Sequence, residues 1–309
     1  MMASSVTDKE LRGELVRHAR NYRERAPVFG INQPVPEESL AQARDLALAI
    51  WNPTLACLLI PPVVGNYQTL IQLPNNGNVS VFHPSGAIAA RMKAAQQRKP
   101  FGPEKEASDR TVLKARAQQV GEGIARRYLA PNEEVRYESF WELNGQVTTL
   151  KGEKSAPMLL EVVSSFRRYL HGLPVLGRAS VHVGLGAGPQ VTQWSVEWRR
   201  VRPEPFVETP IISAEEGAER VLTQMASLRP GKPFTSKDLK VQDFILGYMS
   251  FSPRVPQRVM QPVWVAVLAP LGKFNMGHVV AIPAAPQPFE PLARGPVIPM
   301  APARSTPSN

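Results

Sequence analysis

The fold is decided by the stretch Phe166-Arg-Arg-Tyr-Leu-His-Gly-Leu-Pro-Val-Leu-Gly177 and by the two segments after it, Arg178-Ala-Ser-Val-His-Val183 and Gln190-Val-Thr-Gln-Trp-Ser-Val-Glu-Trp198. In the last segment, from residue 192 on, the even positions are mostly apolar and the odd positions are polar. This alternation predicts a strand with one buried face. Together the segments predict three consecutive strands joined by two turns.

Three helical segments each precede a group of strands. Apolar residues recur at helical spacing in 37–51, 112–129 and 214–227. A capping box, Ser213-Ala-Glu-Glu216, begins the last of these helices. A helix that covers one face of an antiparallel sheet is the simplest way to bury both apolar faces. We therefore expect an α+β fold of tandem modules, each a helix packed on an antiparallel β-sheet.

Local signals set the expected boundaries. A short helix is predicted over 8–25, and Asn144-Gly145 predicts a two-residue hairpin turn between strands 134–143 and 146–150. We expect six parts in order: an N-terminal helix at 1–26, a first helix-plus-strands module at 27–92, a linker at 93–110, a second module at 111–204, a third module at 205–283, and a disordered, proline-rich tail at 284–309.

Composition and charge limit the classes of partner that we expect. The chain has 31 prolines among 309 residues and a formal net charge of +10. The densest basic region, 91–127, has few aromatic residues on which bases could stack, so we expect no nucleic acid partner. The N-terminus lacks the apolar core of a signal peptide. Prolines interrupt the apolar stretch 46–64, so we expect no membrane span or anchor.

The quoted stretch resembles a known motif. Its matching residues are Phe166, Arg168, Tyr169, Gly172, Leu173, Pro174, Val175 and Gly177. They are similar to the FxxYxxGxPVxG strand and turn of PepSY and FTP domains, the propeptide-type domains that precede thermolysin-like and fungalysin-like metalloproteases. Leu246-Gly-Tyr248 and Gln261-Pro-Val-Trp264 resemble a second such unit. By this resemblance, the PepSY-like modules are 111–204 and 205–283. The resemblance implies a cystatin-like fold and a non-catalytic role. Most members of the resembled family lie outside the cytoplasm.

The sequence contains no convincing catalytic or cofactor motif. A glycine-rich loop, Gly184-Leu-Gly-Ala-Gly188, follows a strand, but Pro189 and a β-alternating segment come next. No helix N-terminus is therefore available for a pyrophosphate, and the loop is interpreted as a hairpin. The five histidines do not pair at metal-ligand spacing on one helix, and no His-Glu-x-x-His motif occurs. We expect no cofactor and no metal.

From these observations we expect a non-catalytic protein that binds or regulates a partner. We expect a protein or peptide partner, contacted by the residues Arg168, Tyr169, Trp194, Trp198 and Arg200. Structural turn positions are predicted at Gly172, Pro174 and Gly177. The alternative is a hydrolase or small-ligand enzyme in which His83, His171 or His182 lines a cleft between modules.

Overall fold

The computed structural model describes residues 8–51, 61–73, 77–92, 106–186, 191–228, 234–271 and 277–292. The chain forms two compact units, each built from segments that are distant in sequence. Unit 1 comprises Met1–Gly30, Glu204–Phe251 and Arg258–Asn309, and unit 2 comprises Ile31–Pro203 and Ser252–Gln257.

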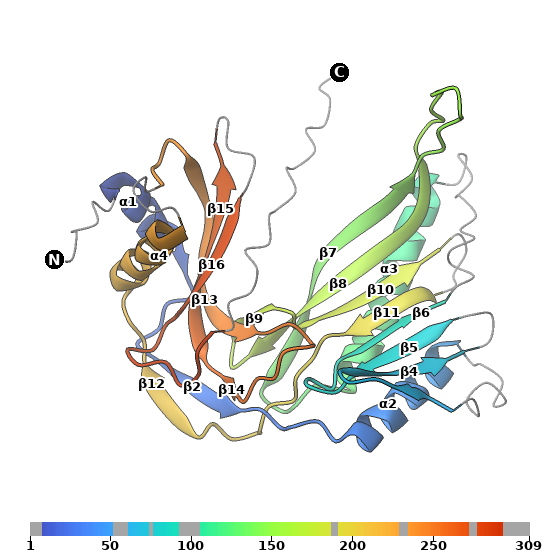
Figure 1. Ribbon diagram of the computed structural model, residues 1–309, viewed down its shortest axis with the longest axis horizontal. Helices are drawn as coiled ribbons and strands as arrows, with labels where there is room; N and C mark the ends of the chain where they lie inside the picture. The colour runs from blue at the N-terminus through green and yellow to red at the C-terminus, as the bar shows by residue number, and fades with distance from the viewer. Residues whose placement is uncertain are drawn as a thin grey trace. The chain divides into compact units, whose positions relative to one another are not determined.

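Unit 2 is built on one antiparallel sheet (Figure 1). Its strands lie in the spatial order β7 (Glu133–Gly145), β8 (Met158–Leu170), β10 (Ser180–Leu185), β11 (Val191–Val196), β6 (Ile88–Arg91), β5 (Asn78–Phe82), β4 (Gln68–Gln72) and β3 (Val63–Val64). A short strand, β9 (Leu173–Gly177), turns back onto the end of β8. Neighbouring strands in this order need not be neighbours in sequence, since β11 pairs with β6.

Two helices, α2 (Pro36–Trp51) and α3 (Glu106–Arg126), supply apolar residues to the core of unit 2. Figure 1 shows α3 behind β7, β8 and β10. The contact between α3 and β8 is close at Gly121, where an added Cβ would collide with the ring of Phe166. From Val162 on, the even-numbered residues of β8 therefore face α3, because side chains alternate between the two faces of a strand. The odd-numbered residues lie on the opposite face.

The main strands of unit 1 are the antiparallel neighbours β13 (Leu239–Ser250), β15 (Pro262–Pro270) and β16 (His278–Pro283). The short β1 (Ala19–Arg20) pairs with β13 in parallel, and Arg20 forms an ion pair with Asp243. The helices α1 (Lys9–Arg17) and α4 (Ala214–Leu228) contact this unit's strands and each other. Gly217 brings α4 close to the sheet, since an added Cβ would lie 2.9 Å from the Trp264 ring.

A smaller antiparallel sheet belongs to unit 1. It has the order β12 (Val207–Pro210), β2 (Arg25–Gly30) and β14 (Val259–Met260). The buried hydroxyl of Tyr248 on β13 donates a hydrogen bond of 2.9 Å to the Pro27 carbonyl oxygen on β2. This bond ties the two sheets of unit 1 together.

The α+β class and the dominance of antiparallel strands are confirmed. The predicted helices at 37–51 and 214–227 match α2 and α4 closely. One half of the predicted capping box is present, because the Glu216 amide donates to the Ser213 hydroxyl oxygen over 3.2 Å; the Glu216 carboxylate pairs with Arg220. The antiparallel pairing of β10 with β11 confirms the hairpin interpretation, while Gly188 and Pro189 lie outside the described residues.

The predicted turn at Asn144-Gly145 is wrong. Both residues belong to β7, where Asn144 pairs with Leu159 and Gly145 with Met158. The chain reverses further on, near Gly152, which has a φ of +85°. The local turn signal was outweighed by the backbone ladder of β7 and β8, two thirteen-residue strands that stay paired from Glu133 to Gly145.

Three predicted boundaries also change. The N-terminal helix ends at Arg17, because the chain then becomes extended and pairs with β13. Helix α3 begins at Glu106, inside the expected linker. Residues 284–292 of the expected disordered tail are ordered in unit 1, with Ala284 and Ala285 fully buried; residues 293–309 lie outside the described part of the chain.

The two units group the segments differently from the expected modules. Strand β6 of the expected first module pairs with β11 of the expected second, through Arg91 with Gln193 and Ile88 with Val196. These strands share one sheet and one core, so the two expected modules form a single unit. The expected third module also takes in strands and a helix from the N-terminal 30 residues.

Candidate functional site

Three of the five predicted binding residues lie in the interior. Arg168, Trp194 and Trp198 are exposed by 0%, 1% and 2%, respectively. Only Tyr169, which is half-buried, and Arg200, which is exposed, are accessible. The alternation in the sequence placed the two tryptophans on one face correctly, but that face is covered by the helices of unit 2.

Arg168 holds a buried polar network together. Its guanidinium forms an ion pair with Glu133 on β7 and donates a hydrogen bond of 2.6 Å to the Arg199 carbonyl oxygen. It also lies over the Trp198 ring, 4.9 Å from the centroid. Burial lowers the pKa of Arg168, and the Glu133 carboxylate opposes that shift. These contacts stabilise unit 2 and leave Arg168 inaccessible to a partner.

The predicted turn is a tight hairpin between β8 and β9. Leu170 pairs with Leu173, so the loop consists of His171 and Gly172, with φ values of +48° and +74°. Two central residues with positive φ are the signature of a type I′ turn, which suits the twist of paired strands. Gly177 also has a positive φ, +79°, whereas Pro174 lies within β9.

The face of the sheet opposite α3 carries an unbroken group of polar and aromatic side chains. We call this group the charged strip. Its members are Glu134, Arg136, Glu138, Arg167, Tyr169, Ser180 and His182. The pairing register places them together, because Glu134 lies opposite Tyr169, Arg136 opposite Arg167, and Arg167 opposite Ser180.

Arg136 and Tyr169 form the aromatic end of the strip. The Arg136 guanidinium lies over the Tyr169 ring at 4.1 Å from the centroid and donates to the Glu134 carboxylate over 2.8 Å. The side chains of Arg136 and Glu134 are 54% and 60% exposed. A partner can therefore reach an arginine whose position is already fixed by a ring and a carboxylate.

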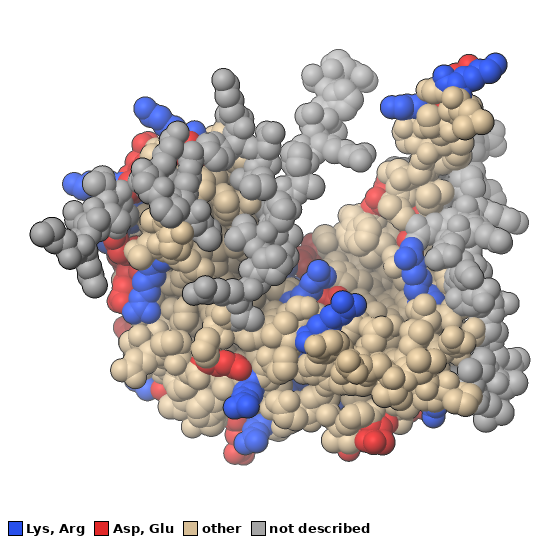
Figure 2. Space-filling view, viewed as in Figure 1, with Lys and Arg blue, Asp and Glu red and all other residues tan. Residues whose placement is uncertain are grey.

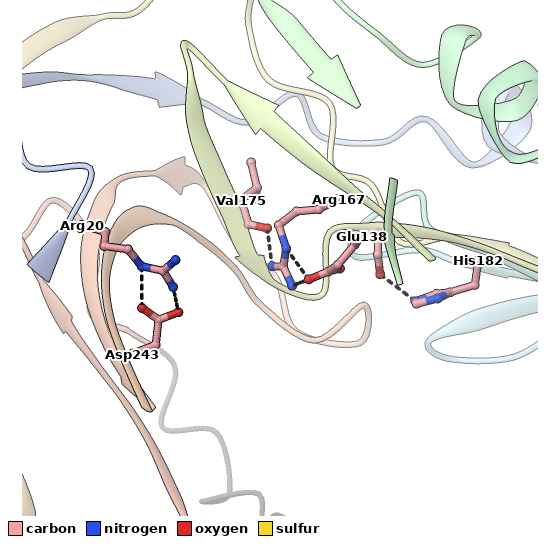
Figure 3. Close-up of polar contacts among 7 residues, drawn as sticks. Arg20, Glu138, Arg167, Val175, His182 and Asp243 are labelled. Atoms are coloured by element: carbon pink, nitrogen blue, oxygen red, sulfur yellow. Dashed lines mark hydrogen bonds and ion pairs between the residues drawn. The ribbon is translucent and has the colours of Figure 1, made fainter. Parts of the chain in front are cut away.

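Arg167 forms the centre of the strip. Its guanidinium pairs with Glu138 and also donates to the Val175 carbonyl oxygen over 3.4 Å (Figure 3). Glu138 occupies an irregularity in the register between Tyr137 and Ser139, which adds a residue to β7 at this point. Alternation along β7 puts the carboxylate on the face that carries Arg167, and the bulge shifts the alternation only after Glu138.

Ser180 and His182 form the far end of the strip on β10. Ser180 Oγ and His182 Nε2 are 2.7 Å apart (Figure 3). Burial lowers the pKa of His182; Glu197 raises it, Arg178 lowers it further, and Glu138 raises it. The imidazole is therefore neutral at neutral pH, and its Nδ1 has no hydrogen-bond partner among the described residues.

The other two candidate histidines lie elsewhere in unit 2. His83 follows β5 and contacts the Thr69 hydroxyl at 2.8 Å, and His171 lies in the β8–β9 turn. Strands β11 and β6 separate β10 from β5, which at about 4.8 Å per strand places β5 about 14 Å from His182's strand. The structure does not bring these three histidines together.

The described residues contain no group of three or more His, Cys, Asp or Glu side chains arranged to hold a metal ion. None of the helices described is both long and apolar enough to cross a bilayer. Among the described atoms visible in Figure 2, basic and acidic side chains are interspersed, without a continuous basic field.

Sequence reasoning missed most of the charged strip. Arg167 joins Arg136 and Glu138 on one face through the β7–β8 register, which the local sequence does not reveal. The one available signal was the alternation of charged residues in Glu134-Val-Arg-Tyr-Glu138, which marks a strand with one polar face.

Comparison with known proteins finds a similar fold but identifies no function. No protein family model and no curated protein matches the sequence. A solved structure of an uncharacterized protein from Eubacterium rectale is similar, with a TM-score of 0.51, 12% sequence identity, and coverage of 85% of this chain and 84% of that chain. At this identity the likeness concerns the fold alone.

Proposed function

We propose that this chain is a binding protein without catalytic activity, and that the charged strip of unit 2 contacts a protein or peptide partner. The observation that carries the proposal is the accessible Arg136 guanidinium stacked on Tyr169, beside the second arginine–glutamate pair of Arg167 and Glu138. The resemblance to PepSY domains supports the same kind of role, since those domains act through protein contacts.

The charge balance of the strip favours a peptide over a simple ion. Arg136 and Arg167 are each paired with a glutamate, so the four ionised groups sum to zero. Such a surface offers no net field for a phosphate or a metal cation. It does offer donors, acceptors and an aromatic ring in alternation, and arginine and tyrosine are the residues that most often dominate protein–protein affinity.

Affinity capture from the native source tests this proposal. The baits are the unchanged protein, a strip variant, Arg136→Glu/Tyr169→Ala, and a matched surface control, Arg116→Glu, on the exposed side of α3. We expect a partner that the unchanged bait and the control recover and that the strip variant loses by at least about tenfold. Recovery of the same set by all three folded baits would count against the proposal.

Hydrolysis is the second candidate function, and the Ser180–His182 contact favours it. A serine hydroxyl 2.7 Å from a neutral imidazole nitrogen meets the first requirement of an activated nucleophile. The imidazole of a Ser–His–acid triad is oriented by a carboxylate at its other nitrogen. Neither Glu138 nor Glu197 makes that hydrogen bond to His182 in the described structure, which is why binding ranks first.

A fluorophosphonate probe separates the two candidates. If Ser180 is a nucleophile, mass spectrometry will locate the probe on Ser180, and His182→Gln will abolish the labelling. We expect no labelling at Ser180 above the level of the Ser180→Ala protein. Specific labelling of Ser180 would replace the binding proposal by the hydrolase.

A further inference from the structure

The C-terminal segment after β16, residues 284–292, lies against unit 1 in an ordered path. We call this segment the strap. Its first residue continues the edge of the sheet, because the Ala284 amide donates to the Pro262 carbonyl oxygen over 3.0 Å. The Ala284 carbonyl oxygen accepts from the Ile212 amide over 2.8 Å. Beyond Ala285 the side chains of Pro286, Gln287 and Pro288 are exposed.

A buried carboxamide then holds the strap by its backbone. Gln261 is only 2% exposed. Its Oε1 accepts from the Phe289 amide over 2.8 Å, and its Nε2 donates to the Glu290 carbonyl oxygen. The chain bends at Phe289 and Glu290, and the Gln261 carboxamide meets a backbone amide and a backbone carbonyl at this bend.

The side chains of Phe289 and Glu290 contact different residues. The Glu290 carboxylate accepts from the main-chain amides of Arg258 and Val259, each over 3.1 Å. The Phe289 ring meets the Phe206 ring edge to face, at 5.7 Å between centroids. Phe206 and Phe289 are still 55% and 41% exposed, so this contact lies at the surface.

We propose that the strap fills, within its own chain, a binding site for a peptide that bends at an aromatic residue followed by a carboxylate. Gln261 recognises the backbone of such a peptide, Phe206 its aromatic ring, and the amides of Arg258 and Val259 its carboxylate. In the strap, Pro288 and Pro291 flank the Phe289-Glu290 pair, at which the chain bends. A partner segment of this chemistry competes with the strap for the site.

A tethered segment acts at a local concentration on the order of millimolar, so a free peptide competes poorly with the unchanged strap. Weakening Phe289 and Glu290 while Gln261, Phe206 and the two amides are kept should open the site. The inference concerns unit 1 and does not depend on the function proposed for the charged strip.

Fluorescence anisotropy tests the site with a labelled peptide that has the sequence of residues 286–292, Pro-Gln-Pro-Phe-Glu-Pro-Leu. The peptide is titrated against full-length protein, against the strap variant Phe289→Ala/Glu290→Ala, and against strap variants that also carry Phe206→Ala or Gln261→Leu. We expect the strap variant to bind at least about tenfold more tightly than the unchanged protein, because its site is no longer filled by a matching segment. Phe206→Ala and Gln261→Leu should each reverse that gain.

Two results would overturn the inference. One is a folded strap variant, shown by circular dichroism, that binds the peptide no better than the unchanged protein does. The other is equal binding of a control peptide in which alanine replaces the phenylalanine and the glutamate. Because Phe206 is a surface residue, its variant keeps the test valid even if Gln261→Leu fails to fold.

Discussion

The guanidinium of Arg168 lies over the ring of Trp198, 4.9 Å from its centroid, and both side chains are buried in unit 2. Both residues were expected on a binding surface, but they belong to the core. The opposite face of the sheet is itself buried at Glu161, Val163 and Ser165, and its accessible part carries the charged strip.

Removing one partner of the buried Arg168–Glu133 pair should strongly destabilise the protein. We expect Arg168→Met to lower the free energy of unfolding by about 3–5 kcal/mol, because Glu133 then remains buried without its counter-charge. The double variant Arg168→Met/Glu133→Leu should lose less than the single one. Urea denaturation measures both. The exposed pair provides the control, since Arg136→Met should cost less than about 1 kcal/mol; equal losses at the two arginines would contradict the assignment.

Two glycines in α3 should respond in opposite directions to the same substitution. A Cβ at Gly121 collides with the Phe166 ring, so Gly121→Ala should cost about 1–3 kcal/mol. A Cβ at the exposed Gly123 meets nothing within 4 Å, so Gly123→Ala should stabilise the helix by about 0.5–1 kcal/mol. Thermal unfolding of both variants checks the face on which α3 packs. A gain in stability at both positions would mean that α3 does not lie on β8 as described.

How much could be predicted from the sequence differs between elements. The strand predicted over 192–198 is found as β11, which ends at Val196, because its apolar period of two is local to the segment. The pairing of Arg91 with Gln193 was not, because nothing in either segment records its partner. For the same reason the period placed Trp194 and Trp198 on one face but left open whether a partner or the protein's own helices cover that face.

The hairpin turn between β8 and β9 should tolerate change at one position and resist it at the other. Gly172 has a φ of +74°, so Gly172→Ala should cost about 1–2 kcal/mol. His171, with a φ of +48°, is a residue for which asparagine is a good substitute, so His171→Asn should leave the free energy of unfolding within about 0.5 kcal/mol. Urea denaturation compares the two. A Gly172→Ala protein as stable as the unchanged one would rule out the turn geometry.

The stability of the protein should depend on pH through His182. Burial holds its folded-state pKa below the ordinary value of 6.5, with Glu197 and Glu138 opposing the shift and Arg178 adding to it. Below pH 6.5 the unfolded chain therefore binds a proton before the folded one does, and stability falls until the pH passes the folded-state pKa.

His182→Gln should remove this contribution. We expect the unchanged protein to lose more free energy of unfolding than the variant as the pH is lowered from 7 to 5, with an excess slope of at most about 1.4 kcal/mol per pH unit. His278, whose pKa burial also lowers, is present in both proteins and cancels in the comparison. Parallel pH profiles for the two proteins would show that His182 is not buried in neutral form.

Photo-crosslinking from the strip in cells of the native source tests the central claim most directly. The photoreactive amino acid p-benzoylphenylalanine is placed at Tyr169 in one protein and at the exposed Arg116 of α3 in another. The proposal predicts a discrete crosslinked partner from position 169 that is absent from position 116 and is lost when Arg136→Glu is added. Identical products from both positions, or a product at 169 that survives Arg136→Glu, would contradict the assignment of the charged strip as the binding surface.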